Sequence, residues 1–527
     1  MAPIPVHVKH AGKVHDVQLD IDQPPTVFKD AIYQVTGVPP ERMKVMVKGG
    51  VLKDDHDWTK VGPKENQTFM VIGTAGELPK PPPKPVVFLE DMEDEELAKA
   101  LAFPVGLVNL GNTCYMNATL QAMRAIPELQ VALGSASGGL AGSLRALYSD
   151  MSKTTDEVTP VRFLSALRQQ FPQFAEIARG KGGMQGMYAQ QDADECWVQM
   201  TNALRDLPGL PGASDSGAPG RTFVDQYMTG VMRRELKCDD PEAADEPPSI
   251  SSEKVLKIEC NISITTNYMH TGIMDALDSK IDKNSPLLGR EATYTAKSRL
   301  ERLPAYLTVH MVRFAWRREI GKKAKIMRRV KFPLEFDATD IVTDELKEKL
   351  LPVNTRLKTV EKDRAERRKV AARTKSQVTT SQTDVDMDAT DSTTVSVPTP
   401  VTTHVNESEV RTTELKELEG LVHPDLKSDT GSNVTGLYDL IAIVTHKGAE
   451  ADAGHYMAYV KKSAFHPVSQ SSRDDNPIGA LAAEDEDWYK FDDNKVSIFP
   501  VEKLVTLAGG GEDSSAYVLL YKAKSLA

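Results

Sequence analysis

A cysteine at the start of a predicted helix is the first residue of this sequence whose setting suggests chemistry. Gly111-Asn112 is a turn signal, and apolar residues then recur at helical spacing through residues 116–123. Cys114 therefore lies in the first turn of the expected helix, where unpaired backbone N–H groups and the positive end of the helix dipole favour a thiolate. A thiolate is a nucleophile, although a lone buried cysteine is more often an inert core residue.

A nucleophilic cysteine needs a base and a group that orients the base. Among the 11 histidines, His455 has the most suggestive setting, because a glycine precedes it and an alternating strand pattern follows over residues 455–462. A second alternating pattern, over residues 487–499, is interrupted by two adjacent acids, Asp492 and Asp493. A carboxylate at that turn would reach a histidine on the neighbouring strand. The residues therefore suggest a Cys–His–Asp triad and leave open which acid completes it.

The composition limits the kind of protein that carries this set of residues. The 527 residues allow two to four domains, and 40% apolar with 26% charged residues is ordinary for a soluble globular chain. A net charge of −11 argues against a nucleic acid or an anionic membrane as the main target. No segment approaches the roughly 18–20 apolar residues of a membrane span, and the N-terminus has no apolar signal segment. We therefore expect a cytosolic or nuclear protein.

The number and spacing of the cysteines limit which disulfide and metal sites are possible. The four cysteines are Cys114, Cys196, Cys238 and Cys260, and no two of them form a CxxC pair. This spacing indicates neither a disulfide scaffold nor a cysteine-rich zinc site. We therefore expect no structural metal and no cofactor, and we expect Cys196 to be a core residue.

Residues 1–75 are expected to form the first domain. Two alternating runs flank an Ala-Gly turn, a helix is expected over residues 27–37 with Val27, Ile32 and Val35 on one apolar face, and a Pro-Pro turn and two short strands follow. This order resembles ubiquitin, chiefly through the segments GVPPERMKVMVKGGVLKDD and GPKENQTFMVIG. Because the chain continues past Gly76 instead of ending in a free Gly-Gly, such a domain would dock a partner and could not be conjugated.

The remaining chain divides by composition into a linker and one large domain. Residues 76–104 form a proline-rich and acidic linker, which is a tether or, alternatively, a ligand for an SH3-type domain. Residues 105–525 form the large domain, with a probable disordered insertion at about 355–412. Its tract of residues 376–403 is rich in Ser and Thr and lacks the apolar surface that folding requires. The basic run before this tract suggests a solvated helix or a nuclear signal.

Four segments of the large domain resemble the ubiquitin-specific proteases, in the family's order. They are GLVNLGNTCYMNATLQ, QQDADECW, LPAYLTVHMVRF, and GHYMAYVK together with WYKFDDNKVS. With the N-terminal ubiquitin-like domain, the chain is most similar to the proteasome-associated subfamily. The resemblance implies an α+β protein in which a ubiquitin-like β-grasp precedes a papain-like catalytic domain with fingers, palm and thumb.

The resemblance also implies the role of each catalytic residue. Cys114 would be the nucleophile and His455 the general base, and Asp492 would orient the imidazole, with Asp493 as the alternative. Asn109 lies at the position that, in the family, donates a hydrogen bond to the oxyanion. The alternative for Asn109 is a turn residue that bonds its own backbone.

Substrate binding can be argued from charge as well as from the resemblance. The ubiquitin tail contains two arginines, so a channel for it needs carboxylates. Gln191, Asp192 and Glu195 lie in the segment that lines this channel in the family. The two acids also fit a cap at a helix start, and both explanations stay open.

The implied function is thiol-dependent hydrolysis of the bond at the C-terminal glycine of ubiquitin. The implied partners are ubiquitin, ubiquitinated proteins and the 26S proteasome regulatory particle, which residues 1–75 would dock, and the implied location is the cytoplasm and nucleus. We expect neither nucleic acid nor membrane as a partner. Two alternatives are a catalytically silent ubiquitin-binding adaptor and a protease for another ubiquitin-like modifier.

Overall fold

The computed structural model divides the chain into two compact units, Met1–Asp91 and Met92–Ala527. It describes residues 3–48, 50–74, 103–178, 186–211, 221–317, 321–381, 407–450, 453–465 and 486–527. Nearly all of the predicted linker, 76–104, lies outside the described residues. Each unit is therefore considered by itself.

The first unit is a mixed sheet packed against one helix. Its elements are β1 (Ile4–His10), β2 (Lys13–Leu19), α1 (Pro25–Thr36), η1 (Pro40–Arg42), β3 (Lys44–Val47), β4 (Gly50–Val51), α2 (Trp58–Val61) and β5 (Thr68–Ile72). The strand order is β2-β1-β5-β3-β4, with β1 and β5 parallel at the centre. The β1–β2 hairpin closes through Ala11 and Gly12, both at positive φ. This is the ubiquitin-like β-grasp that the sequence predicted.

The helix of this unit buries Ile32 as expected, but the other two residues of the predicted apolar face are exposed. Val27 and Val35 are 45% and 37% exposed, whereas Phe28 and Ile32 are buried. Phe28 makes edge-to-face contacts with Trp58 and Phe69, at centroid distances of 5.7 and 5.4 Å. An aromatic side chain buries more apolar area than valine, so the packing of Phe28 sets the rotation of α1.

The second unit has a helical layer that packs on a large central sheet. The helices of this layer are α4 (Cys114–Met123), α5 (Pro127–Leu133), α6 (Gly139–Met151), α7 (Val161–Gln170), α8 (Ala193–Ala203) and α9 (Phe223–Tyr227). The strands are β8 (Ile258–Asn261), β11 (Tyr306–Val312), β12 (Phe314–Arg317), β13 (Lys322–Lys325), β14 (Glu335–Asp337), β15 (Leu437–Glu450), β16 (Ala453–Lys461), β17 (Trp488–Asp492), β18 (Lys495–Phe499) and β19 (Ser515–Ala523). The main path runs β18-β17-β16-β15-β19-β11-β8.

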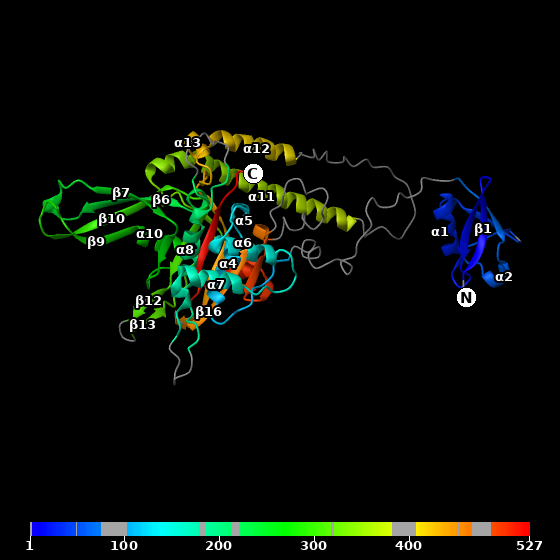
Figure 1. Ribbon diagram of the computed structural model, residues 1–527. Helices are drawn as coiled ribbons and strands as arrows, with labels where there is room; N and C mark the ends of the chain where they lie inside the picture. Colours follow the sequence, from blue (N-terminus) through cyan, green and yellow to red (C-terminus); the bar gives the residue numbers. More distant parts are fainter. Residues whose placement is uncertain are drawn as a thin grey trace. The chain divides into compact units, whose positions relative to one another are not determined.

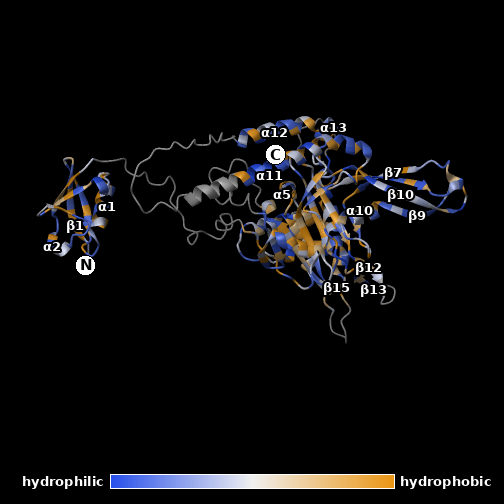
Figure 2. Cartoon of the chain, turned by 180° about the vertical axis from the view of Figure 1, so that it is seen from behind, coloured by the Kyte–Doolittle hydropathy of each residue, from blue (hydrophilic) through white to orange (hydrophobic). Residues whose placement is uncertain are grey.

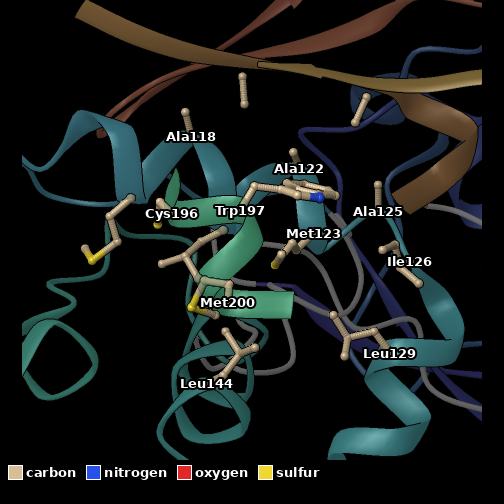
Figure 3. Close-up of a cluster of buried hydrophobic side chains, with 14 of the residues drawn as sticks. Ala118, Ala122, Met123, Ala125, Ile126, Leu129, Leu144, Cys196, Trp197 and Met200 are labelled. Atoms are coloured by element: carbon tan, nitrogen blue, oxygen red, sulfur yellow. The ribbon is translucent and has the colours of Figure 1, made fainter. Parts of the chain in front are cut away.

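Central strands of this sheet are apolar on both faces, because helices and loops cover both sides. The orange colour of these strands in Figure 2 contrasts with the blue of the outer helices. Trp197 of α8 is 1% exposed and lies beside Ala122 and Met123 of α4, as Figure 3 shows. This core fixes α4 against both α8 and the sheet. Within the described ranges, no helix combines the length and apolar character that crossing a bilayer requires.

A separate four-stranded antiparallel sheet projects from the central sheet (Figure 1). It consists of β6 (Gly230–Cys238), β7 (Ser249–Val255), β9 (Asp278–Asn284) and β10 (Glu291–Arg302), and α10 (Met269–Leu277) lies at its base. Cys238 belongs to this sheet and Cys260 to the central sheet. Helical layer, central sheet and projecting sheet are the three parts expected of a thumb, palm and fingers.

The predicted disordered insertion at about 355–412 is wrong at both of its ends. Helix α11 (Asp344–Ser381) continues through the basic run, and α12 (Glu407–Leu421) lies beside it (Figure 1). The basic residues of α11 pair with acids of α12: Arg364 donates to Glu414 at 2.9 Å, and Arg356 is held by Glu417. Leu357 and Leu418 bury their side chains between the helices. Residues 382–406 of the predicted insertion lie outside the described residues.

Candidate active site

The nucleophile candidate Cys114 begins α4 and is 3% exposed. Two left-handed residues, Gly111 at φ 92° and Asn112 at φ 54°, turn the chain into the helix. Asn109 stabilises this turn from inside, because its Oδ1 accepts hydrogen bonds from the backbone N–H groups of Gly111 at 2.9 Å and Thr113 at 3.3 Å. The turn therefore places the Cys114 sulfur at the N-terminus of a helix that is buried along its whole length.

The base candidate His455 lies on β16, and the strand pairing brings it next to β17. Its Nε2 is 2.6 Å from Oδ1 of Asp492. The hydrogen bond with Cys114 and then the bond to Asp492 raise the pKa of His455 to about 9, against the opposing effect of burial. Burial alone would raise the pKa of Asp492, but His455 and Lys490 together hold it below its usual value. The three side chains therefore form a connected row that favours a protonated imidazole beside the thiol.

The second acid, Asp493, faces the other way. It has a left-handed backbone, φ 53°, at the β17–β18 turn. Its carboxylate accepts hydrogen bonds from Nδ2 of Asn109 and Nδ2 of Asn117, both at 2.8 Å. Its backbone carbonyl accepts from the N–H of Leu107 at 3.0 Å. Asp493 therefore joins the turn after β17 to the segment that carries Cys114.

The predicted tail-binding residues lie at the start of α8 (Ala193–Ala203). They differ in whether their polar atoms already have hydrogen-bond partners. Asp192 is the N-cap: its Oδ1 accepts from the N–H of Asp194 at 2.8 Å, and its Oδ2 accepts from the hydroxyl of Tyr517 at 2.7 Å. The Nε2 group of Gln191 is buried and has no hydrogen-bond partner among the described residues. Glu195 is half-buried and makes no hydrogen bond or ion pair to the described part of the chain.

Aromatic side chains lie between this helix start and the triad. The ring of Tyr456, which follows His455, is 4.8 Å from His446 and 6.0 Å from Tyr517. Burial raises the pKa of Tyr456 well above its ordinary value, and the nearby carboxylate of Asp192 adds to this. Burial and the charge of Lys325 lower the pKa of His446 to about 3, so this histidine is a neutral packing residue.

The two strands that lead into and out of His446 and His455 depend on a close glycine and a buried lysine. A Cβ at Gly454 would lie 2.5 Å from Nε2 of His446, so a larger residue does not fit. Lys325 of β13 donates to the carbonyl groups of His446 and Asp513, at 2.9 and 3.1 Å. Burial lowers the pKa of Lys325 to about 8. These contacts tie the β12–β13 hairpin to the strands on either side of the site.

Two residues of the site were missed by the sequence reasoning. Asn117 lies three residues after Cys114, which places it on the same side of the helix. Gln190 has a buried Nε2 with no partner among the described residues, like its neighbour Gln191. The helical spacing from Cys114 is the signal that would have found Asn117, whereas nothing in the sequence distinguishes Gln190 from Gln191.

Comparisons with known proteins agree with this arrangement. Residues 105–521 match the family model "Ubiquitin carboxyl-terminal hydrolase", and residues 6–76 match "Ubiquitin family". "Ubiquitin carboxyl-terminal hydrolase 6" of Schizosaccharomyces pombe is 42% identical, over 99% of this chain and 100% of the relative. "Ubiquitin carboxyl-terminal hydrolase 14" of Caenorhabditis elegans is 29% identical, over 98% of this chain and 93% of the relative.

A weaker likeness exists to a solved structure, that of the SAGA Ubp8/Sgf11/Sus1/Sgf73 DUB module bound to ubiquitin aldehyde. The sequence identity is 15%, the TM-score is 0.46, and the match covers 80% of this chain and 70% of the other.

Proposed function

The chain belongs to the ubiquitin carboxyl-terminal hydrolase family and is a cysteine deubiquitinase, and we propose that Cys114, His455 and Asp492 carry out its reaction at the proteasome. The observation that supports these roles is the connected row of thiol, imidazole and carboxylate. A thiolate paired with an imidazolium is the reactive form of such a site at neutral pH. The pKa of about 9 for His455 keeps its ring protonated there.

The reaction proceeds in two steps. The Cys114 thiolate attacks the carbonyl carbon of the terminal glycine of ubiquitin, and the C–N bond breaks as His455 gives its proton to the departing lysine amine. The product is a thioester between Cys114 and ubiquitin. His455, now neutral, takes a proton from water, whose oxygen attacks the thioester and releases free ubiquitin and the cysteine.

The oxyanion of each step needs donors, and Asn109 supplies one in this proposal. A side-chain amide has two N–H bonds. One of them is bound to Asp493 at 2.8 Å, which leaves the other for the oxyanion beside the backbone N–H of Cys114. In this proposal Asp493 is a positioning residue, because it orients the amides of Asn109 and Asn117.

The tail of ubiquitin is proposed to bind at the start of α8. Asp192 already accepts two hydrogen bonds but retains lone pairs for a third. Glu195 has no competing partner, so it is the better candidate for an arginine of the tail. The unpartnered amide of Gln191 offers a donor for a backbone carbonyl of the tail.

Replacement of the nucleophile tests the chemistry. Cys114→Ala is expected to abolish cleavage of a ubiquitin C-terminal reporter, whereas Cys238→Ala, in the projecting sheet, leaves it intact. Activity retained by the Cys114 variant would refute the assignment. A ubiquitin-derived electrophile should label Cys114, and failure to label would favour the silent adaptor. Labelling by the electrophile of another ubiquitin-like modifier, but not of ubiquitin, would favour the third alternative.

Docking to the 26S proteasome regulatory particle is proposed for the ubiquitin-like unit. Met46, Met70 and Ile72 are 38%, 53% and 54% exposed on neighbouring strands of its sheet, and Met46 pairs directly with Met70. A contiguous apolar patch on a small domain is typical of a protein-binding surface. The enzyme would then trim ubiquitin from proteasome substrates in the cytoplasm and nucleus.

Reporter cleavage with and without purified 26S proteasome tests this docking. We expect stimulation by the proteasome, its loss on deletion of residues 1–75, and its loss in Met70→Glu. Val27→Glu is the matched control, because Val27 is similarly exposed but lies on α1. Equal stimulation of all variants would show that another part of the chain docks.

A further inference from the structure

A cavity of about 500 Å³ lies beyond the C-terminal end of the Cys114 helix. It is bounded by the end of α4, by α5 and α6, and by α14 (Lys462–Phe465). The ten residues of α4 separate it from Cys114 by about 15 Å, at a rise of about 1.5 Å per residue. The cavity is therefore distinct from the triad and from the proposed tail channel.

An arginine at this end of α4 lacks a counter-charge. The Nη1 atom of Arg124 is buried and has no hydrogen-bond partner in the described part of the chain. Burial lowers the pKa of Arg124, and its guanidinium lies 5.5 Å from the ring centre of Phe465. Buried polar groups are normally bonded, so the Nη1 atom of Arg124, which has no partner among the described residues, is a donor that could bind an anion.

A second arginine lines the same cavity. Arg145 of α6 donates from Nη1 to the carbonyl of Ala136 at 3.1 Å, which leaves most of its donors available. Ser149, one turn later on α6, adds a hydroxyl to the lining. No carboxylate is among the described residues that line this cavity. Its polar side therefore has two positive charges and no negative charge to balance them.

Part of the cavity lining is apolar. Pro127 and Leu133 of α5 form this part, together with Phe465 of α14. Cavities of this size that combine apolar walls with a few polar groups are typical of small-molecule sites. The ligand that fits both sides has an anionic head and an apolar or aromatic body.

We propose that this cavity binds a small phosphomonoester with an apolar or aromatic body. A phosphomonoester has close to two negative charges at neutral pH and presents oxygens that pair with guanidinium groups in a bidentate manner. Arg124 and Arg145 bind the phosphate, Ser149 donates to a remaining oxygen, and Pro127 and Phe465 contact the organic group. Inorganic phosphate should bind more weakly, because it contacts only the polar residues of the cavity. An aromatic carboxylate should also bind more weakly, because it carries only one negative charge.

Calorimetric titration of the full chain with phenyl phosphate tests the proposal, with inorganic phosphate and benzoate as comparators. We expect saturable binding of phenyl phosphate, at least about tenfold tighter than that of either comparator. Absence of saturation up to about 10 mM phenyl phosphate would overturn the proposal, because a weaker site would have no specific recognition. Equal binding of inorganic phosphate would overturn the assigned role of the apolar wall.

Substitutions locate the site. Arg145→Gln is expected to weaken phenyl phosphate binding about tenfold or more, through loss of charge-assisted hydrogen bonds. Arg162→Gln is the matched control, because Arg162 is also exposed but lines only the neighbouring cavity, which Arg145 lines too, so binding in that cavity would be weakened by both variants. Arg124→Gln should weaken binding in the same way. Because Arg145 is exposed, its variant is expected to retain reporter cleavage, which verifies the fold. Unchanged affinity in a folded Arg145→Gln protein would refute the site.

Discussion

Asp492→Asn tests the geometry around His455 most directly. The substitution replaces a carboxylate 2.6 Å from Nε2 by a neutral amide of the same shape. A nearby opposite charge shifts a pKa by about 1–3 units. The side chains of His455 and Asp492 are 33% and 37% exposed, so solvent screens the pair and the lower end of this range applies. The pKa of His455, raised to about 9 with Cys114 as the largest cause, should therefore fall by about one unit.

The pH dependence of kcat/KM for a ubiquitin reporter measures this change. As the pH rises through about 9, the imidazolium of His455 loses its proton, and the departing amine is no longer protonated. Activity therefore falls on the alkaline side. In Asp492→Asn this alkaline limb should move to lower pH by about one unit, because kcat/KM reports the groups of the free enzyme.

Asp493→Asn is the matched control, since it makes the same change in the adjacent residue. Asp493 binds Asn109 and Asn117 and does not bind His455. Loss of one charge-assisted hydrogen bond, worth about 1.5–3 kcal/mol, should lower kcat/KM roughly 10- to 100-fold without moving the alkaline limb. If the limb moves in Asp493→Asn and stays in Asp492→Asn, the assignment of the two acids is wrong.

Three further experiments test packing, one beside the site and two elsewhere in the second unit. Gly454→Ala places a Cβ 2.5 Å from Nε2 of His446, so kcat/KM should fall about 10²-fold; unchanged kinetics would contradict the close approach. Arg364→Met removes one of the two arginines that bind the buried Glu414 and leaves Arg367 at 2.8 Å, so the free energy of unfolding in urea should fall by about 1.5–3 kcal/mol, and an unchanged value would contradict a contribution from this pair. Trp197→Ala should cost about 3–5 kcal/mol in the same assay, and a cost below 1 kcal/mol would mean that the core collapses around the substitution.

The parts of the site that the sequence predicted are those with local signals. Cys114 follows a glycine turn and opens an apolar helix, and His455 opens an alternating strand, so both could be found from neighbouring residues. The hydrogen bond between Asn117 and Asp493 joins residues 376 positions apart. No local pattern reports such a contact, and for that reason the reasoning from the sequence left Asp492 and Asp493 as alternatives.

The fold shows the same division between local and long-range information. Several strands follow from hydrophobic periodicity, whereas the α+β class was predicted from the resemblance to ubiquitin and to the ubiquitin-specific proteases. The basic run before the Ser/Thr tract was predicted as a solvated helix or a nuclear signal, within an insertion at about 355–412 that was expected to be disordered. Its order depends on α12 (Glu407–Leu421), whose Glu414 and Glu417 neutralise Arg364 and Arg356 across the helix pair. The basic run is therefore a helix, as one interpretation had it, but the expected disorder at the two ends of the insertion is wrong, because each helix is ordered by a partner far away in the sequence.

The two adjacent acids also explain how the helical layer and the central sheet are positioned relative to each other at the active site. Successive residues of a strand point to opposite faces, so one acid of a pair at a strand end can face a neighbouring strand while the next faces a different layer. Asp492 bonds His455 within the sheet, and Asp493 bonds Asn109 and Asn117 of the helical layer. One dipeptide therefore contacts both the base and the segment that carries the nucleophile. A one-residue insertion between these acids would separate the two contacts, and it should reduce activity more than either single substitution.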